Sequence, residues 1–383
     1  MKIAFLTNYY NYHQAEFSKF MSVETNNNFF FITTSQMDED RIKMGWNNGI
    51  LPDFVIDYKS DSEKCDQIIN SADVVIIGSA PRRLIKERLK RKKVTLFYSE
   101  RIDKRKSSFL KILKELPLFY YYFGRYSNYY CLCASAFTSY DFSKRNCFKE
   151  KCYKWGYFPQ NVDFNPNNRL NKTMHEKCEL LFCSRLIELK HPEFAIMVAK
   201  HLKEEGISFN LNILGSGDLD YDISKQISDL GLSDEVHLIG AVPPETVREY
   251  MLNSDIFLFT SDRREGWGAV LNESMSNACA VVASSEIGSV PFLLKDGVNG
   301  YIYQDGNFQD FYCKVKELCL DQDKRKELSE AAFNTILNTW NAEVGVKRMM
   351  ELFDDLIKYG ESNRYKDGPC SKAEIIKDGW YNN

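Results

Sequence analysis

Apolar runs of strand length alternate with longer amphipathic runs along most of this chain, and the alternation starts again in the second half. The strand-like runs are KIAFLT, FFFITT, DVVIIGS, VTLFYS and YYCLCAS, then CELLFCSRL, FNLNILGSG, VHLIGA, DIFLFTS and AVVASS. Helical patterns such as QAEFSKFMSVE and PEFAIMVAKHLKEEG lie between most of them. Apolar strands separated by helices indicate a parallel sheet covered on both faces. The sequence therefore predicts two doubly wound α/β domains with a cleft between them.

The two halves are separated by a segment with the composition of a linker. Residues 159–173, PQNVDFNPNNRLNKT, contain two prolines, five asparagines and few apolar side chains. With 383 residues the chain is long enough for two separate cores. We expect an N-terminal domain over residues 1–165 and a second domain over residues 166–345. Residues 346–383 are expected to form a helix and a tail that return to the N-terminal domain.

The general features of the sequence favour a cytoplasmic protein. The N-terminus, MKIAFLTNYYNYHQ, turns polar too soon for a signal peptide, and no apolar run reaches the roughly 18 residues of a membrane span. The eleven cysteines form no repeating framework, so we expect reduced and mostly buried thiols. The segments CLC and NCFKEKC lack the partner pairs and histidines of a zinc site, so no metal ligation is predicted there.

The stretch SDRREGWGAVLNESMSNACAVVAS, residues 261–284, places two carboxylates eight positions apart around a Gly-Trp-Gly turn. A strand precedes the turn and a helix follows it, so Gly266 and Gly268 stand before a helix N-terminus at the carboxyl edge of the second sheet. Ligands of doubly wound sheets bind at this edge, and the free N–H groups of a helix start favour an anion such as phosphate. Glu265 and Glu273 can accept hydrogen bonds from hydroxyl groups of the same ligand.

Residues at the ends of other strands of the second half point to the same edge. In LLFCSRLIELKHPE, Arg185 and Lys190 follow the first strand, where cations can neutralise a diphosphate. In ILGSGD, Gly215 and Gly217 let the backbone approach a ligand closely. Backbone groups around Ile239, at the end of VHLIG, can form hydrogen bonds with a planar nucleotide base. Each feature alone is compatible with a plain turn or a solvated surface, and their joint placement favours a binding site.

On these residues the second half resembles the donor-binding domain of glycosyltransferase family 4, retaining enzymes of the GT-B fold with two Rossmann-like domains. The family signature is glutamate, seven residues, glutamate, which EGWGAVLNE matches, and its upstream Arg and Lys correspond to Arg185 and Lys190. The segment IGSVPFLLKDGVNGYIY also resembles the family. The resemblance covers about residues 178–345 well and the first half more loosely. Cys279 stands where glycine is usual, and Phe292 where glutamate is often found.

The resemblance implies a role for each matched residue. Glu265 would contact the donor sugar at the catalytic centre, and main-chain amides just after it would hold sugar and phosphate. Arg185 and Lys190 would meet the diphosphate, and Glu273 the ribose hydroxyls. With the strand-end residues above, the predicted donor-binding set is Arg185, Lys190, Gly215, Ile239, Gly266, Trp267, Gly268, Leu271 and Glu273.

Two residues of the first half are candidates for the catalytic region. The loop after the first strand, NYYNYHQAEF, is rich in aromatic residues and contains His13. Similar YHQ starts, and stretches like YKWGYFP, occur in glycosyltransferases of bacterial surface-polysaccharide clusters. His13 is therefore predicted to contact the acceptor or to handle a proton, and a histidine that caps the next helix is the alternative. Glu100, in FYSERIDKR, follows another strand and is the second candidate.

Residues 82–130 combine a basic stretch with an aromatic one. Twelve Lys and Arg between Arg82 and Lys106 face three acidic residues, and FLKILKELPLFYYYFGRYSNYY follows. This combination suits an anionic membrane surface at the inner face of the plasma membrane, and a solvated helix beside core aromatics is the alternative. Residues 1–165 hold 26 Lys and Arg against 18 Asp and Glu, whereas the remainder holds 24 against 35. Opposite charge suggests different partners for the two halves, and no nucleic-acid-binding motif is present.

The segment GDLDYD contains an Asp-x-Asp, a pattern that binds a divalent metal in a different glycosyltransferase fold. Here it follows a strand end and precedes a helix, so helix capping is the expected role. We predict that no metal and no cofactor is required.

The function that this sequence predicts is transfer of a sugar, with retention of configuration, from a nucleotide diphosphate sugar of the UDP or GDP type. The acceptor would be a hydroxyl of an oligosaccharide or of a lipid-linked saccharide, in polysaccharide biosynthesis. Two alternatives stay open at this point. One is a nucleotide-sugar 2-epimerase of the same fold, and the other is an inactive scaffold that binds a nucleotide sugar.

Overall fold

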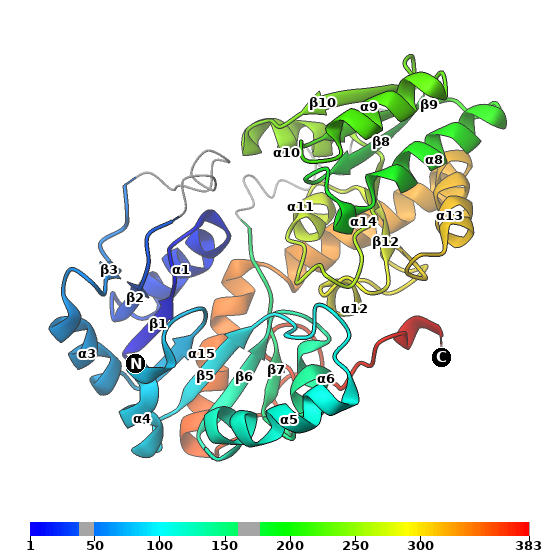
Figure 1. Ribbon diagram of the computed structural model, residues 1–383. Coiled ribbons are helices and arrows are strands. Elements are labelled where there is room, and N and C mark those ends of the chain that lie inside the picture. The colour runs from blue at the N-terminus through cyan, green and yellow to red at the C-terminus, as the bar shows by residue number, and fades with distance from the viewer. Residues whose placement is uncertain (38–49, 160–176, 383) are drawn as a thin grey trace. The chain divides into compact units, whose positions relative to one another are not determined.

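The computed structural model describes residues 1–37, 50–159 and 177–382. The chain divides into two compact units, and each is an α/β domain built on a parallel sheet (Figure 1). Unit 1 contains residues 1–160 and 339–377, and unit 2 contains residues 161–338 and 378–383. The predicted fold class, with two doubly wound Rossmann-like domains, is confirmed.

Unit 1 is built on a seven-stranded sheet in the order β3-β2-β1-β4-β5-β6-β7. The sequence predicted its five longer strands and missed β3 and β7, which have three residues each and lie at the two edges. The strands are β1 (Ile3–Thr7), β2 (Phe29–Thr33), β3 (Val55–Asp57), β4 (Val74–Ile77), β5 (Thr95–Ser99), β6 (Tyr129–Cys133) and β7 (Cys152–Lys154).

Helices cover both faces of this sheet because successive strand side chains point to opposite sides. Leu6 and Ile77 belong to a core shared with α3, α4 and α6, whereas Phe5 packs edge-on against Phe17 of α1. On that second face α1 packs against α15. The helical elements of unit 1 are α1 (Tyr12–Glu24), α3 (Ser62–Ser71), η1 (Arg82–Ile85), α4 (Lys86–Lys90), α5 (Phe109–Phe119), η2 (Tyr120–Gly124), α6 (Thr138–Ser143) and α15 (Ala342–Lys358).

Unit 2 is built on a six-stranded sheet in the order β10-β9-β8-β11-β12-β13. The strands are β8 (Cys178–Cys183), β9 (Phe209–Leu214), β10 (Val236–Gly240), β11 (Ile256–Phe259), β12 (Ala280–Ser284) and β13 (Tyr301–Tyr303). The helical elements are η3 (Glu188–Lys190), α8 (Pro192–Glu204), α9 (Asp220–Asp229), α10 (Pro244–Asn253), α11 (Val270–Ser276), α12 (Val290–Leu293), α13 (Phe308–Leu320), α14 (Gln322–Asn338) and η4 (Trp380–Asn382). One core joins α8, α9 and α13 to the sheet, and α14 packs against α11 and β12.

In each sheet the strand order reverses beside the first strand of the unit. The reversal falls between β1 and β4 in unit 1 and between β8 and β11 in unit 2. Ligands of open α/β sheets bind outside the carboxyl ends of the strands at such a switch point. We therefore expect a donor site at the loops after β8 and β11.

The boundaries of the two units differ from those read from the sequence. The expected boundary at residue 165 lies outside the described residues. The second division falls between Asn338 and Thr339 rather than at residue 345, because the chain enters α15, which packs on α1. Residues 346–377 lie in unit 1, but residues 378–383 group with unit 2. The tail thus crosses back, which the sequence did not indicate.

All eleven cysteines are free and eight of them are buried. Within the described ranges, every helix is too short or too polar to span a bilayer.

Candidate active site

Lys190 and Glu265 meet at the switch point of the second sheet. Lys190 ends η3, which follows β8, and Glu265 lies in the loop after the neighbouring strand β11. Their side chains are only 12% and 15% exposed and form an ion pair. The hydroxyl of Thr260, at the start of the same loop, donates to the Lys190 carbonyl over 2.6 Å. Strand order alone brings together these two residues, which are 75 positions apart.

A second set of charged side chains holds the loop that carries Glu265. Arg264 contacts the carboxylate of Asp262 with Nη2 at 2.7 Å, and His191 Nε2 lies 3.4 Å from the same carboxylate. The Asp262 amide also donates to the carbonyl of Leu189 over 3.0 Å. Burial disfavours the charge of Asp262, but hydrogen bonds from His191 and Arg264 outweigh it and hold the pKa of this carboxyl well below its usual range. These contacts fix the loop to the segment after β8.

His191 contacts two acidic side chains, those of Glu193 and Asp262. Its backbone has φ = 48°, a left-handed conformation that a few residue types such as His adopt more readily than most. Hydrogen bonds to Asp262 and then to Glu193 raise the pKa of the imidazole to about 9, so the ring is protonated at neutral pH. A cation thus lies one residue after Lys190, at the same strand end.

The Gly-Trp-Gly turn is shaped by contacts within the protein. Gly268 has φ = 81°, and a Cβ there would lie 2.4 Å from the ring of Phe259. Trp267 is fully buried, and its indole Nε1 donates to Asn272 Oδ1 over 2.8 Å. Leu271 is also fully buried. The side chains of Trp267 and Leu271 belong to the core, so any donor contact at these positions would come from backbone groups.

Glu273 lies in α11 and has an unusual protonation equilibrium. Burial raises its pKa to about 7, and the positive charge of Arg248 only partly opposes this. Cys183, at the end of β8, lies near enough to both Glu273 and Lys190 for their charges to affect its thiol. Burial, and after it the charge of Glu273, raise the Cys183 pKa to about 12, whereas the charge of Lys190 opposes this shift. Glu273 and Lys190 therefore act on the same thiol.

The remaining donor-site candidates lie at the same edge of the sheet. Arg185 is exposed just beyond the end of β8. Gly215, after β9, has φ = 125°, and a Cβ there would lie 1.9 Å from the Ser184 carbonyl oxygen. This close approach of two backbones requires glycine even without a ligand. Ile239 is half-buried near the end of β10, where the pairing with β9 is irregular.

In the Asp-x-Asp segment, Asp220 has a structural contact. It begins α9, and its carboxylate accepts a hydrogen bond from the Gly217 amide over 2.7 Å. The cap residue of α9 is Leu219 and no side chain caps the helix there, so the predicted capping by the Asp-x-Asp segment is wrong. The first-turn position of Asp220 and Asp222 still favours the helix start, where negative charge is stabilised.

The structure brings His13 and Glu100 of unit 1 together through a residue that the sequence did not single out. Tyr157 stacks on the His13 ring with centroids 5.6 Å apart, and its hydroxyl donates to Glu100 Oε1 over 2.9 Å. Lys104 pairs with the other oxygen of Glu100 at 2.9 Å. Burial lowers the pKa of His13 to about 4, so its ring is neutral at pH 7. His13 is the second residue of α1, and the cap residue is Asn11.

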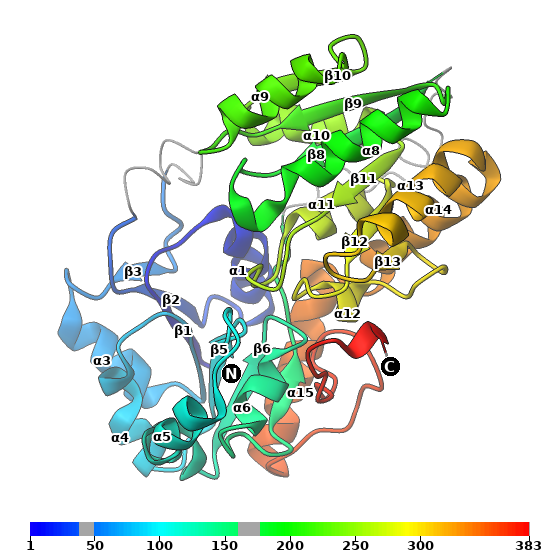
Figure 2. The same ribbon diagram turned by 45° about the vertical axis from the view of Figure 1, so that its right-hand side comes forward.

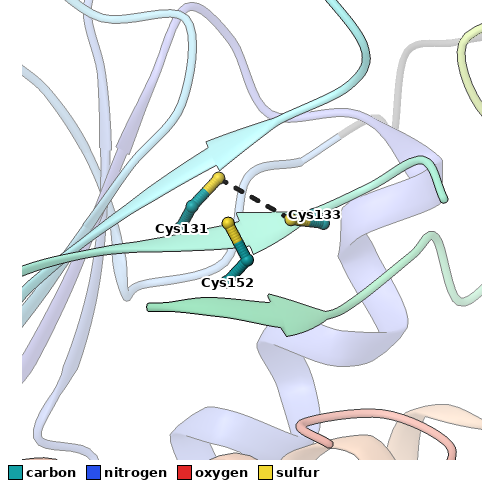
Figure 3. A group of neighbouring side chains, drawn as sticks. All are labelled: Cys131, Cys133 and Cys152. Carbon is teal, nitrogen blue, oxygen red and sulfur yellow. Dashed lines mark hydrogen bonds between the residues drawn. The ribbon is translucent and has the colours of Figure 1, made fainter. Parts of the chain in front are cut away.

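Three cysteines of unit 1 form a cluster that could hold a metal by distance alone. The Sγ atoms of Cys131, Cys133 and Cys152 lie within 4.8 Å of one another (Figure 3). All three belong to the apolar core of unit 1. Burial raises the pKa of the Cys131 and Cys133 thiols well above the usual range, which favours their neutral form, whereas hydrogen bonds from these two thiols lower the pKa of Cys152, so the cluster does not supply the three thiolates that a metal would need. We assign the cluster to core packing, and it lies on strands β6 and β7.

Several residues of the site were missed at the sequence level. His191, Asp262 and Arg264 were not assigned roles, although the charge density of SDRRE and of KHPE was visible. Tyr157 lies within YKWGYFP, a stretch that resembles other glycosyltransferases but whose pattern assigns no role to the tyrosine. The contact between Arg264 and Asp262 is local, but the roles of His191 and Tyr157 depend on partners far away in the sequence, which no local pattern reveals.

Comparison with known proteins supports the reading of unit 2. Residues 166–335 match the family described as "Glycosyl transferases group 1". The chain is 29% identical over 195 residues to the amylovoran biosynthesis glycosyltransferase AmsK of Erwinia amylovora, a match over 50% of this chain and 48% of that protein. It is 24% identical over 184 residues to the putative colanic acid biosynthesis glycosyltransferase WcaL of Salmonella typhimurium, over 46% and 45% of the two chains. The matched part spans about half the length of these curated relatives.

Solved structures extend the similarity of fold to most of the chain. Anabaena Alr3699/HepE in complex with UDP has a TM-score of 0.69 at 16% identity, over 93% of this chain and 100% of that chain. A glycosyltransferase from Rickettsia africae ESF-5 has a TM-score of 0.65 at 15% identity, over 94% and 99%. The chain is a GT-B protein by its fold, and its second unit is similar to the glycosyl transferases of group 1.

Proposed function

We propose that this protein is a glycosyltransferase that moves a sugar from a nucleotide diphosphate sugar to a saccharide hydroxyl, with retention of anomeric configuration. The observation that carries the proposal is the partly buried pair of Lys190 and Glu265 at the switch point, with Glu273 on α11, the helix that follows the Glu265 loop. A cation for the diphosphate and carboxylates for sugar and ribose hydroxyls are the groups that such a donor needs. HepE, which has a similar fold, was solved with UDP.

In this proposal, donor binding replaces the ion pair between Lys190 and Glu265 with contacts from each residue to the donor. The diphosphate takes Lys190 from Glu265, and Arg185, which is exposed and close to η3 in sequence, supplies a second cation. Glu265 is then free to accept hydrogen bonds from the sugar. Fixed cations stabilise the negative charge that grows on the diphosphate as it leaves, which is where a transferase gains rate. The acceptor hydroxyl attacks from the same face, and the departing phosphate takes its proton.

We assign the acceptor to unit 1. The neutral His13 ring, Tyr157 and Glu100 offer a stacking surface and hydrogen-bonding groups, a combination that suits a sugar. The relatives AmsK and WcaL are named for amylovoran and colanic acid biosynthesis, which supports polysaccharide biosynthesis as the setting. An oligosaccharide or a lipid-linked saccharide is the proposed acceptor.

Product analysis with UDP- and GDP-sugars and a mixture of saccharide acceptors tests this proposal. We expect free nucleoside diphosphate together with a glycosylated acceptor of the same anomeric configuration as the donor. An epimerised donor without transfer would instead establish the epimerase alternative. Tight donor binding with neither product would establish the scaffold.

We further propose that the transfer needs no divalent metal, because Arg185, Lys190 and His191 supply positive charge near the diphosphate. The measurement is turnover in excess EDTA, compared with turnover after Mg²⁺ or Mn²⁺ is restored. Equal rates are expected. Activity that appears only with the metal would contradict this part of the proposal and leave the transfer itself in place.

A further inference from the structure

Helix α5 and the turn η2 of unit 1 present an apolar face to solvent. Phe109 is 72% exposed, Leu110 69%, Leu118 54% and Tyr121 47%. Leu113, Pro117, Tyr120 and Tyr122 are exposed as well. Counted from residue 110, residues 113 and 114, 117 and 118, and 121 follow after three or four, seven or eight, and eleven positions. This spacing places them on one side of the helix. Not one residue of α5 is buried, and the helix lies at the outer surface of unit 1 (Figures 1 and 2).

The inner side of the same segment anchors it to the domain. Phe119 packs against Phe123 and Phe142, with ring centroids 5.5 and 6.1 Å apart. Glu115 accepts from Arg145 Nη2 at 2.6 Å, which ties α5 to the residues that follow α6. The exposed side is therefore held in place by the core.

The charges around the apolar face are almost all positive. Arg105, Lys106, Lys111, Lys114 and Arg125 are exposed. The acidic residues of this segment are engaged: Asp103 is buried against Lys144 and Arg145, and Glu115 pairs with Arg145. A cationic rim around exposed leucines and tyrosines matches a surface that is negative outside and apolar beneath.

We propose that the face formed by residues 105–125 docks on an anionic lipid bilayer, with the leucines and tyrosines entering the headgroup boundary and the cations meeting lipid phosphates. This surface goes beyond the proposed transfer and does not depend on the donor site. A second copy of the chain is a poorer occupant, because two faces with the same cationic rim repel each other. A docked unit 1 would work next to lipid-linked saccharides.

The basic stretch at η1 and α4 also belongs to the segment for which the sequence predicts a membrane contact, but it is less suited to this contact. Arg88 is buried, and its guanidinium donates to backbone carbonyls of Ala72 and Val94 at 2.6 Å. Lys93 donates to the carbonyl of Asn70, and Lys90 pairs with Glu87. Much of the charge there is used within the protein.

The test is co-flotation of the purified chain with vesicles of phosphatidylcholine mixed with phosphatidylglycerol, against vesicles of phosphatidylcholine alone. We expect binding only to the anionic vesicles, and weaker binding in high salt. The triple variant Leu110→Ser, Leu118→Ser, Tyr121→Ser should lose binding, with Val298→Ser, Leu320→Ser, Ile357→Ser as the control at exposed apolar positions elsewhere. Each cation near an anionic bilayer raises the membrane partition coefficient by a factor of about five. The triple variant Arg105→Glu, Lys106→Glu, Lys114→Glu should therefore lower this coefficient more than about a hundredfold.

A matched charge control is Lys86→Glu, Lys90→Glu, Arg91→Glu in α4 and its C-cap, which should bind like the unaltered chain. Wild-type binding by the α5 variants, or loss of binding only in the α4 variant, would overturn the proposal. A dimer in sedimentation that the serine variant abolishes, with no vesicle binding, would overturn it in favour of self-association. Circular dichroism verifies the fold of each variant, and nucleoside diphosphate binding to the same samples reports on the donor site separately.

Discussion

At the scale of single residues, Glu273 is a carboxylate held where ionisation is costly. Its folded-state pKa of about 7 exceeds the ordinary value because of burial. A raised carboxyl pKa lowers stability above the unfolded pKa, since the unfolded chain ionises first, and this cost grows until the pH reaches the folded pKa. Such a cost is expected where a group serves binding rather than stability.

We predict that Glu273→Gln separates these two effects. The free energy of unfolding at pH 7.5 should rise by about 1–2 kcal/mol relative to the unaltered chain, and this gain should vanish below pH 4.5. The affinity for a nucleoside diphosphate should fall, because the amide accepts hydroxyl hydrogen bonds less well than a carboxylate. Urea titrations across pH and calorimetric binding measure the two quantities. Unchanged affinity would remove Glu273 from the site.

Glu265 and Lys190 lead to a second residue-scale prediction. Glu265 forms an ion pair with Lys190, the cation that would bind the diphosphate. Glu265→Gln should therefore leave nucleoside diphosphate binding as strong as before or stronger, while sugar transfer falls by about 100-fold or more because a contact made to the sugar is lost. Lys190→Gln is the matched control and should weaken nucleotide binding. If Glu265→Gln weakens nucleotide binding as much as Lys190→Gln does, the exchange of partners is wrong.

At the scale of elements, the C-terminal tail supports the loop after β11. Asp378 pairs with Arg263 at 3.2 Å, two positions before Glu265. The Gly379 amide donates to the buried Glu286 over 2.7 Å, and the Trp380 indole donates to the Ser285 carbonyl over 2.9 Å. The tail thus links the loop that carries Glu265 to the loop after β12.

Truncation after Lys377 should lower turnover several-fold through a looser loop, with unit 2 destabilised by about 1–2 kcal/mol for the lost hydrogen bonds. Asp378→Asn is the milder test and should affect turnover more than stability. Steady-state kinetics measures turnover, and thermal unfolding measures stability. The tail would have no part in the site if the truncated chain kept full turnover at saturating donor.

At the scale of the whole molecule, the chain runs from unit 1 to unit 2, back to unit 1 and again to unit 2. The proposed donor contacts nevertheless all lie in unit 2. We predict that saturating nucleoside diphosphate slows hydrogen exchange at residues 184–190 and 262–268 and leaves α3, α4 and α5 unchanged, since a ligand protects the segments that it orders. Protection confined to unit 1 would contradict the assignment of the donor to unit 2.

The sequence alone determined the fold class and most strands, because the pattern of apolar runs follows directly from burial on both sheet faces. It missed β3, β7 and β13, whose three residues are too few to form a pattern. The positions of Glu265 and Lys190 after strands, and of Glu273 in the helix after the Glu265 loop, also followed from local pattern and motif.

Only the tertiary structure decided what these residues touch. Strand order brought Lys190 into contact with Glu265, and it brought His191 into contact with Asp262. It also turned the apolar side of α5 outward and returned the tail to unit 2. The physical reason is that local patterns report burial and hydrogen bonding within a segment, whereas partners distant in sequence are chosen by how the segments pack.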